Sequence, residues 1–284
     1  MTVRRLTIIG LGLIGGSIGL ALRRAKAGYV ITGHTRNPKN AGRAKQLGAV
    51  DRAEWNLPAA VEQADIVLVA TPVLAVREVF QQIAPYLKPG AVVTDVASTK
   101  QQVLAWAAEL LPPHVSFVGG HPMAGKEQAG IEAADANLFQ GCVYCILAGE
   151  HSTDAAVDQV TAIATAVGGR PFFLDPAEHD SFVAAISHLP FILSAALVNT
   201  VAESPAWRDL TRLAAGGFRD VSRLASGDPV MHRDICLTNQ ESIRRWIQLF
   251  RAELDRFERQ LDADSDLLAS FTRAKEARDA WLAQ

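Results

Sequence analysis

The sequence predicts an α/β fold in which a doubly wound parallel sheet in residues 1–175 is followed by an all-helical domain in residues 176–284. Three observations lead to this prediction. Short β-rich runs alternate with helical patterns through residue 174, and a glycine-rich turn follows the first of these runs. From Ala177 to Gln284, by contrast, no convincing strand pattern occurs.

The N-terminal half contains a regular alternation of elements. The runs that are typical of strands are 6–10, 30–33, 66–70, 91–95, 115–118, 142–147 and 171–174. The helical patterns between them are 14–25, 41–47, 73–87, 100–110 and 154–167. Strands that alternate with helices of this length indicate parallel βαβ units, and therefore a sheet with helices on both faces.

The C-terminal half contains only helical patterns. They cover 179–203, 205–213, 229–261 and 265–282. The long third pattern carries an apolar stripe at spacings of three to four residues that includes Ile243, Ile247, Phe250, Leu254 and Phe257. Such a stripe is covered either by the core of its own domain or by a second subunit, and the pattern does not distinguish the two.

Composition excludes several classes of protein. A net charge of −2 over 284 residues removes the electrostatic case for a nucleic-acid or anionic-membrane partner. No run reaches eighteen consecutive apolar residues, so no membrane span is expected. The cysteines are three, Cys142, Cys145 and Cys236, and so sparse and odd a set favours a reducing compartment, here the cytoplasm. Cys142 and Cys145 are interpreted as part of a buried strand, and no metal site is predicted.

The glycine-rich turn predicts a dinucleotide site. Gly10, Gly12 and Gly15 follow a strand and open a helix, which is the context of the Rossmann-type fingerprint. Gly10 allows the tight turn, Gly12 the approach of a pyrophosphate, and Gly15 close packing of the helix on the sheet. The first helical residues, Leu13 and Ile14, then offer backbone N–H groups to the anion.

The end of the second strand predicts a preference for NADP, with NAD as the alternative cofactor. An NAD enzyme usually carries a carboxylate there to bind the ribose 2′-hydroxyl. This chain has Thr35 and Arg36 instead, and Arg36 can bind a 2′-phosphate through charge-assisted bonds. Arg36 in solvent or stacked on adenine remains the alternative. Thr71 and Pro72, after the third predicted strand, are expected at the same cofactor.

Several motifs resemble one family of enzymes. Three segments stand after predicted strands, where doubly wound sheets bind ligands: 70–72, 95–100 and 119–127. The motifs in question are VTDVASTK at 93–100, GHPMAG at 120–125, NLF at 137–139, SHLP at 187–190 and GFRDVSR at 217–223. Together, and over residues 6–234, they resemble the prephenate/arogenate dehydrogenases of tyrosine biosynthesis.

This resemblance implies an oxidative decarboxylation. A base removes the proton of the C4 hydroxyl of the ring, hydride passes to nicotinamide, and loss of CO2 from C1 leaves an aromatic ring. His121 matches the catalytic histidine of the family, and a neutral imidazole accepts a proton near pH 7. Ser98 matches a residue that bonds this histidine or the substrate hydroxyl, and His188 matches a second active-site histidine.

The resemblance also implies a set of substrate-binding residues. Arg223 matches an arginine that grips a substrate carboxylate, and Asp220 orients it or simply pairs with it at i, i+3. Lys126 and Glu127 follow the histidine motif and are expected at the cleft, although Glu127 is equally well interpreted as a solvated loop carboxylate. His232 stands where some members have tryptophan, which changes part of the expected pocket.

Two other interpretations remain open at this point. A two-domain dehydrogenase or reductase of the β-hydroxyacid or pyrroline-carboxylate type has a similar plan, but Lys275 is the only lysine between Ala177 and Gln284 to serve as its base. A non-catalytic NADP-binding sensor is the second rival. The family implies a homodimer through the helical domain, and the residues do not decide between prephenate and arogenate. With no room before Gln284 for a further regulatory domain, tyrosine is expected to act only as a competitor at the active site.

Overall fold

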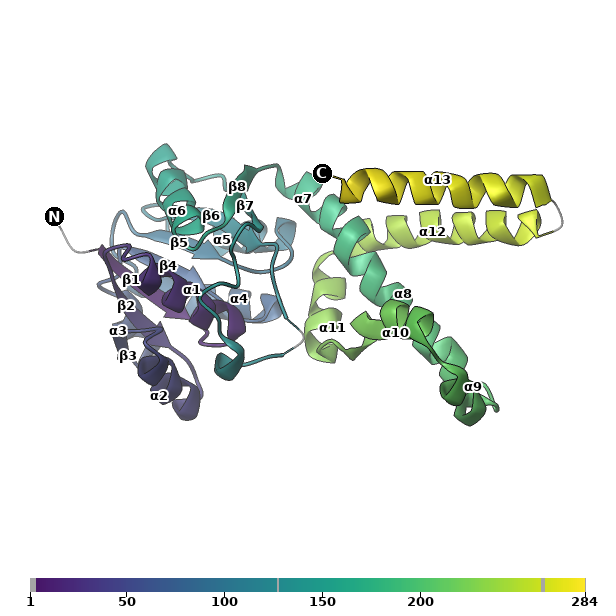
Figure 1. Cartoon of the computed structure of the whole chain (residues 1–284). Helices are drawn as coiled ribbons and strands as arrows, with labels where there is room; N and C mark the ends of the chain where they lie inside the picture. Colours follow the sequence, from purple (N-terminus) through teal and green to yellow (C-terminus); the bar gives the residue numbers. More distant parts are fainter. Residues whose placement is uncertain (1–3, 127, 262–263, 284) are drawn as a thin grey trace.

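The computed structural model describes residues 4–126, 128–261 and 264–283. A sheet domain occupies the N-terminal part, and helices that extend away from it form the C-terminal part (Figure 1). The predicted fold class, a Rossmann-type sheet followed by a helical domain, is therefore confirmed.

The sheet has eight strands in the order β3-β2-β1-β4-β5-β6-β7-β8. Their bounds are β1 Arg4–Ile9, β2 Tyr29–His34, β3 Arg52–Ala53, β4 Ile66–Val69, β5 Val92–Asp95, β6 Ser116–Pro122, β7 Val143–Ala148 and β8 Arg170–Phe173. All pairs are parallel except β6–β7. The carboxyl ends of β1, β2, β4, β5 and β6 therefore lie along one edge, which is where such sheets bind ligands.

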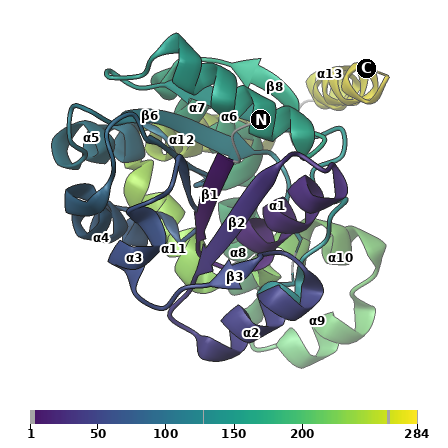
Figure 2. The same ribbon diagram turned by 90° about the vertical axis from the view of Figure 1, so that its left-hand side faces the viewer.

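Helices cover both faces of the sheet (Figure 2). On one face α1 (Leu13–Arg24), α2 (Pro38–Leu47) and α6 (Asp154–Ala166) pack in one buried apolar cluster. On the other face α3 (Leu57–Val61), α4 (Val73–Ile83) and α5 (Gln101–Leu110) pack in a second. Strands such as β4, with all four residues buried, are consequently apolar throughout instead of alternating.

Three features of the sheet differ from the prediction. The predicted strand 115–118 extends to Pro122, and its partner β7 is antiparallel instead of parallel. Glycines at 119 and 120 are typical of a loop, but pairing with β7 keeps them in the strand. The two-residue β3 and the five-residue α3 are too short to show a periodic pattern and were not predicted. Cys145 is buried in β7, and Cys142 precedes that strand.

The C-terminal half is helical, as predicted, with different breaks. Its elements are α7 Pro176–Val183, a π-helical turn Ala184–His188, α8 Leu189–Ala202, α9 Trp207–Leu213, α10 Gly216–Ser222, a 3₁₀ turn Arg223–Ser226, α11 Pro229–Thr238, α12 Gln240–Gln260 and α13 Asp264–Leu282. The pattern predicted as one helix over 229–261 is broken at Asn239 (φ −135°, ψ 40°). Asn239 is buried there and donates from Nδ2 to the backbone oxygen of Asp180, so a contact distant in sequence fixes the corner. α10 was not predicted as a helix, because it begins with two glycines.

The apolar stripe of α12 is only partly covered. Ile243 is buried, whereas Leu254 is 52% exposed. On α13, which runs beside α12 in Figure 1, Phe271 and Trp281 are also exposed. Within the described chain, the stripe is thus core at its beginning and uncovered towards its end.

One continuous helical stretch is strongly apolar. The continuous helix Pro176–Ala202 is long and apolar enough to cross a membrane when judged by length and composition alone, although it contains no run of eighteen apolar residues. Core helices of non-membrane proteins pass the same test. His179, Asp180 and His188 on this stretch are buried, and the first two hydrogen-bond with the sheet domain.

Candidate active site

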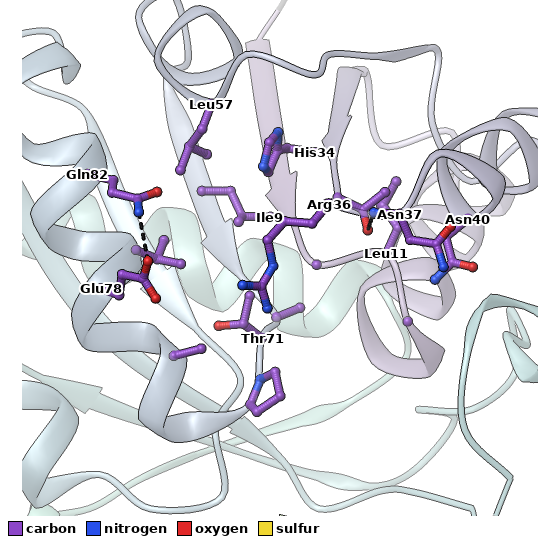
Figure 3. A pocket seen from close by; sticks show the side chains of 17 residues that line it. Ile9, Leu11, His34, Arg36, Asn37, Asn40, Leu57, Thr71, Glu78 and Gln82 are labelled. Atoms are coloured by element: carbon purple, nitrogen blue, oxygen red, sulfur yellow. Dashed lines mark hydrogen bonds between the residues drawn. The ribbon is translucent and has the colours of Figure 1, made fainter.

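A cavity of about 460 Å³ opens at the carboxyl edge of the sheet (Figure 3). Six of the nine predicted cofactor residues line it: Gly10, Gly12, Thr35, Arg36, Thr71 and Pro72. The other three, Leu13, Ile14 and Gly15, begin α1 and are not part of the wall. Leu13 and Ile14 still present the first N–H groups of the helix towards this turn.

Glycine occupies each of the three positions of the turn for a different structural reason. A Cβ at Gly10, whose φ is 102°, would lie 2.4 Å from the backbone oxygen of Ala70. A Cβ at Gly15 would lie 2.0 Å from the oxygen of Gly10, so the helix packs directly on the turn. Gly12, in contrast, faces open space, which leaves room for a ligand to approach the backbone. These positions agree with the roles inferred from the spacing.

The residues of this cavity suit a dinucleotide. No side chain caps the N-terminus of α1 in the described structure, and its first turn has no acidic residue, so its N–H groups and dipole are available to an anion. The Oγ1 atom of Thr71 is buried and has no hydrogen-bond partner among the described residues. A buried hydroxyl without a partner is costly unless a ligand or water satisfies it.

The pocket also contains residues that sequence reasoning missed, namely His34, Asn37, Asn40, Leu57, Glu78 and Gln82. Arg36 extends across the cavity towards Thr71, and Glu78 accepts a 2.9 Å bond from Gln82 on the opposite wall (Figure 3). Glu78 stands one turn into α4, beyond the strand end at which site residues were sought. Its position could have been found by continuing the helical spacing from Pro72.

His121 lies inside β6 and pairs with Cys145 of β7, not in a loop as predicted. Close packing requires a glycine at the preceding position, Gly120. A Cβ at Gly120 would lie 2.6 Å from the Asp95 backbone oxygen and 3.1 Å from the ring of Tyr144. Because β6 runs parallel to β5, His121 stands at the same edge of the sheet as the cofactor cavity.

A buried ion pair supports this part of β6. Lys100 and Asp95 have completely buried side chains, and the Nζ atom of Lys100 donates to Asp95 Oδ2. The same Nζ donates to the backbone oxygen of Gly120 over 2.8 Å, and Gly120 N in turn donates to Asp95 Oδ1. The pair therefore links the end of β5 to the residue before His121. Burial lowers the pKa of Lys100, and Asp95 opposes that shift.

His121 is also connected to the helical domain. Its Nδ1 lies 2.9 Å from Nε2 of His179, and Nδ1 of His179 lies 2.8 Å from Oδ1 of Asp180. Desolvation, followed by the neighbouring His179, Lys100 and His188, lowers the pKa of His121 well below its usual 6.5. His121 is thus neutral near pH 7, as a base must be.

His188 ends the π-helical turn and is buried. Its Nδ1 lies 3.3 Å from Nδ2 of Asn239. Burial is the main cause that lowers the pKa of His188 to about 4, against the opposing charge of Asp180. The Asn239 amide also donates to the Asp180 carbonyl, so Nδ1 of His188 is the acceptor and its Nε2 carries the proton. His188 is therefore a neutral donor close enough to His121 to affect its pKa.

The remaining predicted site residues are less closely assembled. Ser98, between β5 and α5, is half-buried and makes no hydrogen bond to the described residues, so it does not bond His121 here. Arg223 begins a 3₁₀ turn that is bonded to α8 through Ala225 N and Ser194 Oγ, and Asp220 is exposed in α10. These residues keep their predicted roles as proposals.

Two further residues predicted to bind substrate contact other side chains of the described chain. Lys126 forms a 2.9 Å ion pair with Asp135 on the surface. The ring of His232 stacks on Phe191 with centroids 4.1 Å apart, and burial lowers the pKa of His232. Glu127 lies outside the described residues.

Comparison with known proteins identifies the family. Models of the prephenate dehydrogenase nucleotide-binding domain and dimerization domain match residues 18–172 and 175–273. The prephenate dehydrogenase of Bacillus subtilis (strain 168) is 36% identical over 96% of this chain and 74% of that protein. The A. aeolicus prephenate dehydrogenase in complex with hydroxyphenyl propionate and NAD+ has a TM-score of 0.92, with 31% identity over 99% of both chains. The Synechocystis arogenate dehydrogenase has a TM-score of 0.84, with 30% identity over 98% of this chain and 99% of that one.

These matches decide between the dehydrogenase types that the sequence left open. The two domain models follow one another along the chain, and together they include the second half of α1, His121, His188 and Arg223. Because these models match most of its length and a relative aligns over nearly all of it, this chain belongs to the prephenate dehydrogenase family of NAD(P)-dependent oxidoreductases.

Proposed function

We propose that the chain oxidises and decarboxylates prephenate, arogenate or both, with hydride transfer to NADP in preference to NAD. The observation that carries this proposal is a neutral His121 at the carboxyl edge of the sheet. The dinucleotide cavity opens at the same edge. The N-terminus of α1 would hold the pyrophosphate of the cofactor at this same edge, and the nicotinamide would then be available to a base there. The products are 4-hydroxyphenylpyruvate from prephenate and tyrosine from arogenate.

In this mechanism, Nε2 of His121 accepts the proton of the ring hydroxyl at C4. A bound nicotinamide supplies the hydride acceptor. The hydride leaves C4, which becomes a carbonyl carbon. When the C1 carboxylate leaves as CO2, its bonding electron pair enters the ring and makes it aromatic, and the C4 oxygen takes the proton back from His121 to give the phenol. Ser98 orients the hydroxyl, His188 donates a hydrogen bond from Nε2, and Arg223 binds a carboxylate in a bidentate fork. Arg223 is assisted by Asp220, with Lys126 at the mouth of the cleft and His232 in the pocket wall.

The NADP preference rests on charge. Arg36 is the one permanent cation among the described side chains that line the cavity, and no carboxylate follows β2. Glu78 on the opposite wall would repel a phosphate, but it is bonded to Gln82 across the cavity from β2. A 2′-phosphate next to Thr35 and Arg36 would gain charge-assisted hydrogen bonds that a 2′-hydroxyl cannot form.

The assembly proposed is a homodimer through the helical domain, in the cytoplasm and without nucleic acid or membrane. The supporting observation is apolar surface on α12 and α13, where Leu254 and Phe271 are more than half exposed within one chain. A patch of this kind on a soluble enzyme marks an association surface. Light scattering at micromolar concentration should give twice the chain mass, and a monomer would contradict the proposal.

The function is tested by following reduced nicotinamide with prephenate and arogenate, each with NAD and with NADP. We expect turnover that is faster with NADP and that is lost in H121N, because asparagine keeps a polar group but accepts no proton. H114Q, which changes a histidine whose ring bonds the Leu87 carbonyl outside the cavity lining, is the control and should turn over normally. No turnover with any of the four pairs would reject the proposal and favour the NADP-binding sensor.

A further inference from the structure

We propose that His179 and Asp180 are positioning residues that hold the proton of His121 on Nδ1 and leave its Nε2 free as the base. This inference rests on the proposed function, since it assigns a role to two residues in the same reaction. The three side chains, called the relay below, form one line of hydrogen bonds from β6 into α7. Neither His179 nor Asp180 was predicted as a positioning residue from the sequence.

The argument begins at Asp180, whose side chain is completely buried. Its Oδ1 accepts bonds from Lys100 N over 2.8 Å and from His179 Nδ1, and its Oδ2 accepts one from Gln101 N over 2.9 Å. Asp180 therefore caps the N-terminus of α5, where the helix dipole favours an anion. A carboxyl group that accepts backbone N–H bonds on both oxygens has no proton to donate. The proton between Asp180 and His179 must then lie on Nδ1 of His179.

The second step passes this assignment to His121. In the proposed arrangement His179 carries a single ring proton, on Nδ1, which leaves a lone pair on Nε2. Nε2 of His179 is consequently the acceptor of the 2.9 Å bond, and Nδ1 of His121 is the donor. His121 is neutral, so its own Nε2 then carries a lone pair. The carboxylate of Asp180 thus determines, through one intervening ring, which nitrogen of His121 can act as the base.

The relay also supports the charge that forms during the reaction. When Nε2 of His121 takes the substrate proton, the ring becomes an imidazolium in surroundings that disfavour it, with Lys100 and His188 nearby. Its Nδ1 proton can then move to Nε2 of His179, which places the positive charge next to the Asp180 carboxylate. Besides Asp180, the titratable groups next to the two rings are Lys100, His188 and Cys145, the last being the strand partner of His121. Lys100 is paired with Asp95, so Asp180 is the anion in direct contact with the histidine pair.

Asp180 is unsuitable for the first test, because its carboxylate also caps α5. The informative pair of variants is H179F and H179Q. Phenylalanine fills the site without an acceptor, whereas the Oε1 atom of glutamine can still accept the bond from His121 Nδ1. We expect kcat to fall about 10²- to 10⁴-fold in H179F, as for loss of an orienting group, with KM changed less than threefold. The kcat of H179Q should be at least tenfold higher than that of H179F.

A direct readout is ¹⁵N NMR of histidine-labelled protein, with the His121 signals assigned by their disappearance in H121N. In the unmodified enzyme we expect a protonated Nδ1 and a bare Nε2 on His121, and in H179F a shift towards the opposite tautomer. H114Q should leave these signals unchanged. A protonated Nε2 in the unmodified enzyme, or a kcat of H179F within threefold of normal, would overturn the relay. The NMR result does not depend on turnover, so it separates failure of the relay from failure of the proposed function.

Discussion

The buried pair of Lys100 and Asp95 offers a sharp test of how this site is supported. In K100M, a methionine of similar length fills the space of the lysine but leaves Asp95 without its cation. Both side chains are completely buried, so no water can replace the lost partner. Asp95 keeps two backbone donors, Ala97 N and Gly120 N, whereas the Gly120 oxygen loses its bond from Nζ.

The expected cost follows from the uncompensated charge. Removing one partner of a buried ion pair destabilises a protein by about 3–5 kcal/mol. The lost bond to the Gly120 oxygen is part of that total and acts on the residue before His121. We therefore expect a loss of about 3 kcal/mol or more in the free energy of unfolding, together with a reduced kcat. The double variant D95N/K100M, which removes both charges, should be more stable than K100M alone.

Lys88 provides a matched control. Its Nζ also donates to a carboxylate, Asp65 Oδ1, and to a backbone oxygen, that of Gln63, but its side chain is 35% exposed. K88M should cost only about 0.2–1 kcal/mol, because water solvates the remaining charge. Urea unfolding of all four proteins gives the comparison. The reasoning is wrong if K100M costs less than 1 kcal/mol, or no more than K88M.

Three further predictions test the cofactor site, the buried histidine and the strand packing. R36A should lower kcat/KM for NADP about 10- to 100-fold while that for NAD changes little, because charged hydrogen bonds contribute about 1.5–3 kcal/mol; equal losses with both cofactors would exclude phosphate recognition. Because burial lowers the pKa of His188 to about 4, the unfolded chain binds more protons between pH 4 and 6.5, so stability should rise with pH in this window and H188Q should flatten the urea midpoint profile. G120A should destabilise the enzyme by about 1–3 kcal/mol and reduce kcat, since its Cβ would lie 2.6 Å from the Asp95 carbonyl. G42A, where a Cβ meets nothing within 4 Å among the described residues, should be no less stable than the unmodified enzyme, and equal unfolding midpoints for G120A and G42A would contradict the packing argument.

The sequence was most informative where structure depends on near neighbours. The alternation of strands and helices, the turn from Gly10 to Gly15 and the start of the helical half are local patterns, and the structure agrees with them. The positions of Thr35, Arg36, Thr71 and Pro72 at the cofactor cavity follow from strand ends alone, because parallel strands present those ends on one edge.

What the sequence missed depends on contacts between distant residues. β6 extends to His121 because β7 pairs with it antiparallel, and no local pattern specifies that partner. The corner at Asn239 exists because its side chain reaches Asp180, 59 residues away. Asp180 itself is buried at the N-terminus of α5, a position that no local pattern in the sequence indicates.

By itself, the sequence indicated the alternation of strands and helices, the dinucleotide turn and the candidate base, because each is encoded in adjacent residues or in a motif. Only the tertiary structure decided what surrounds that base. His179 lies 58 residues from His121 and reaches it only when α7 packs against α5 and the end of β6. The tautomer of a histidine depends on its partner in space, and spacing along the chain carries no information about that partner.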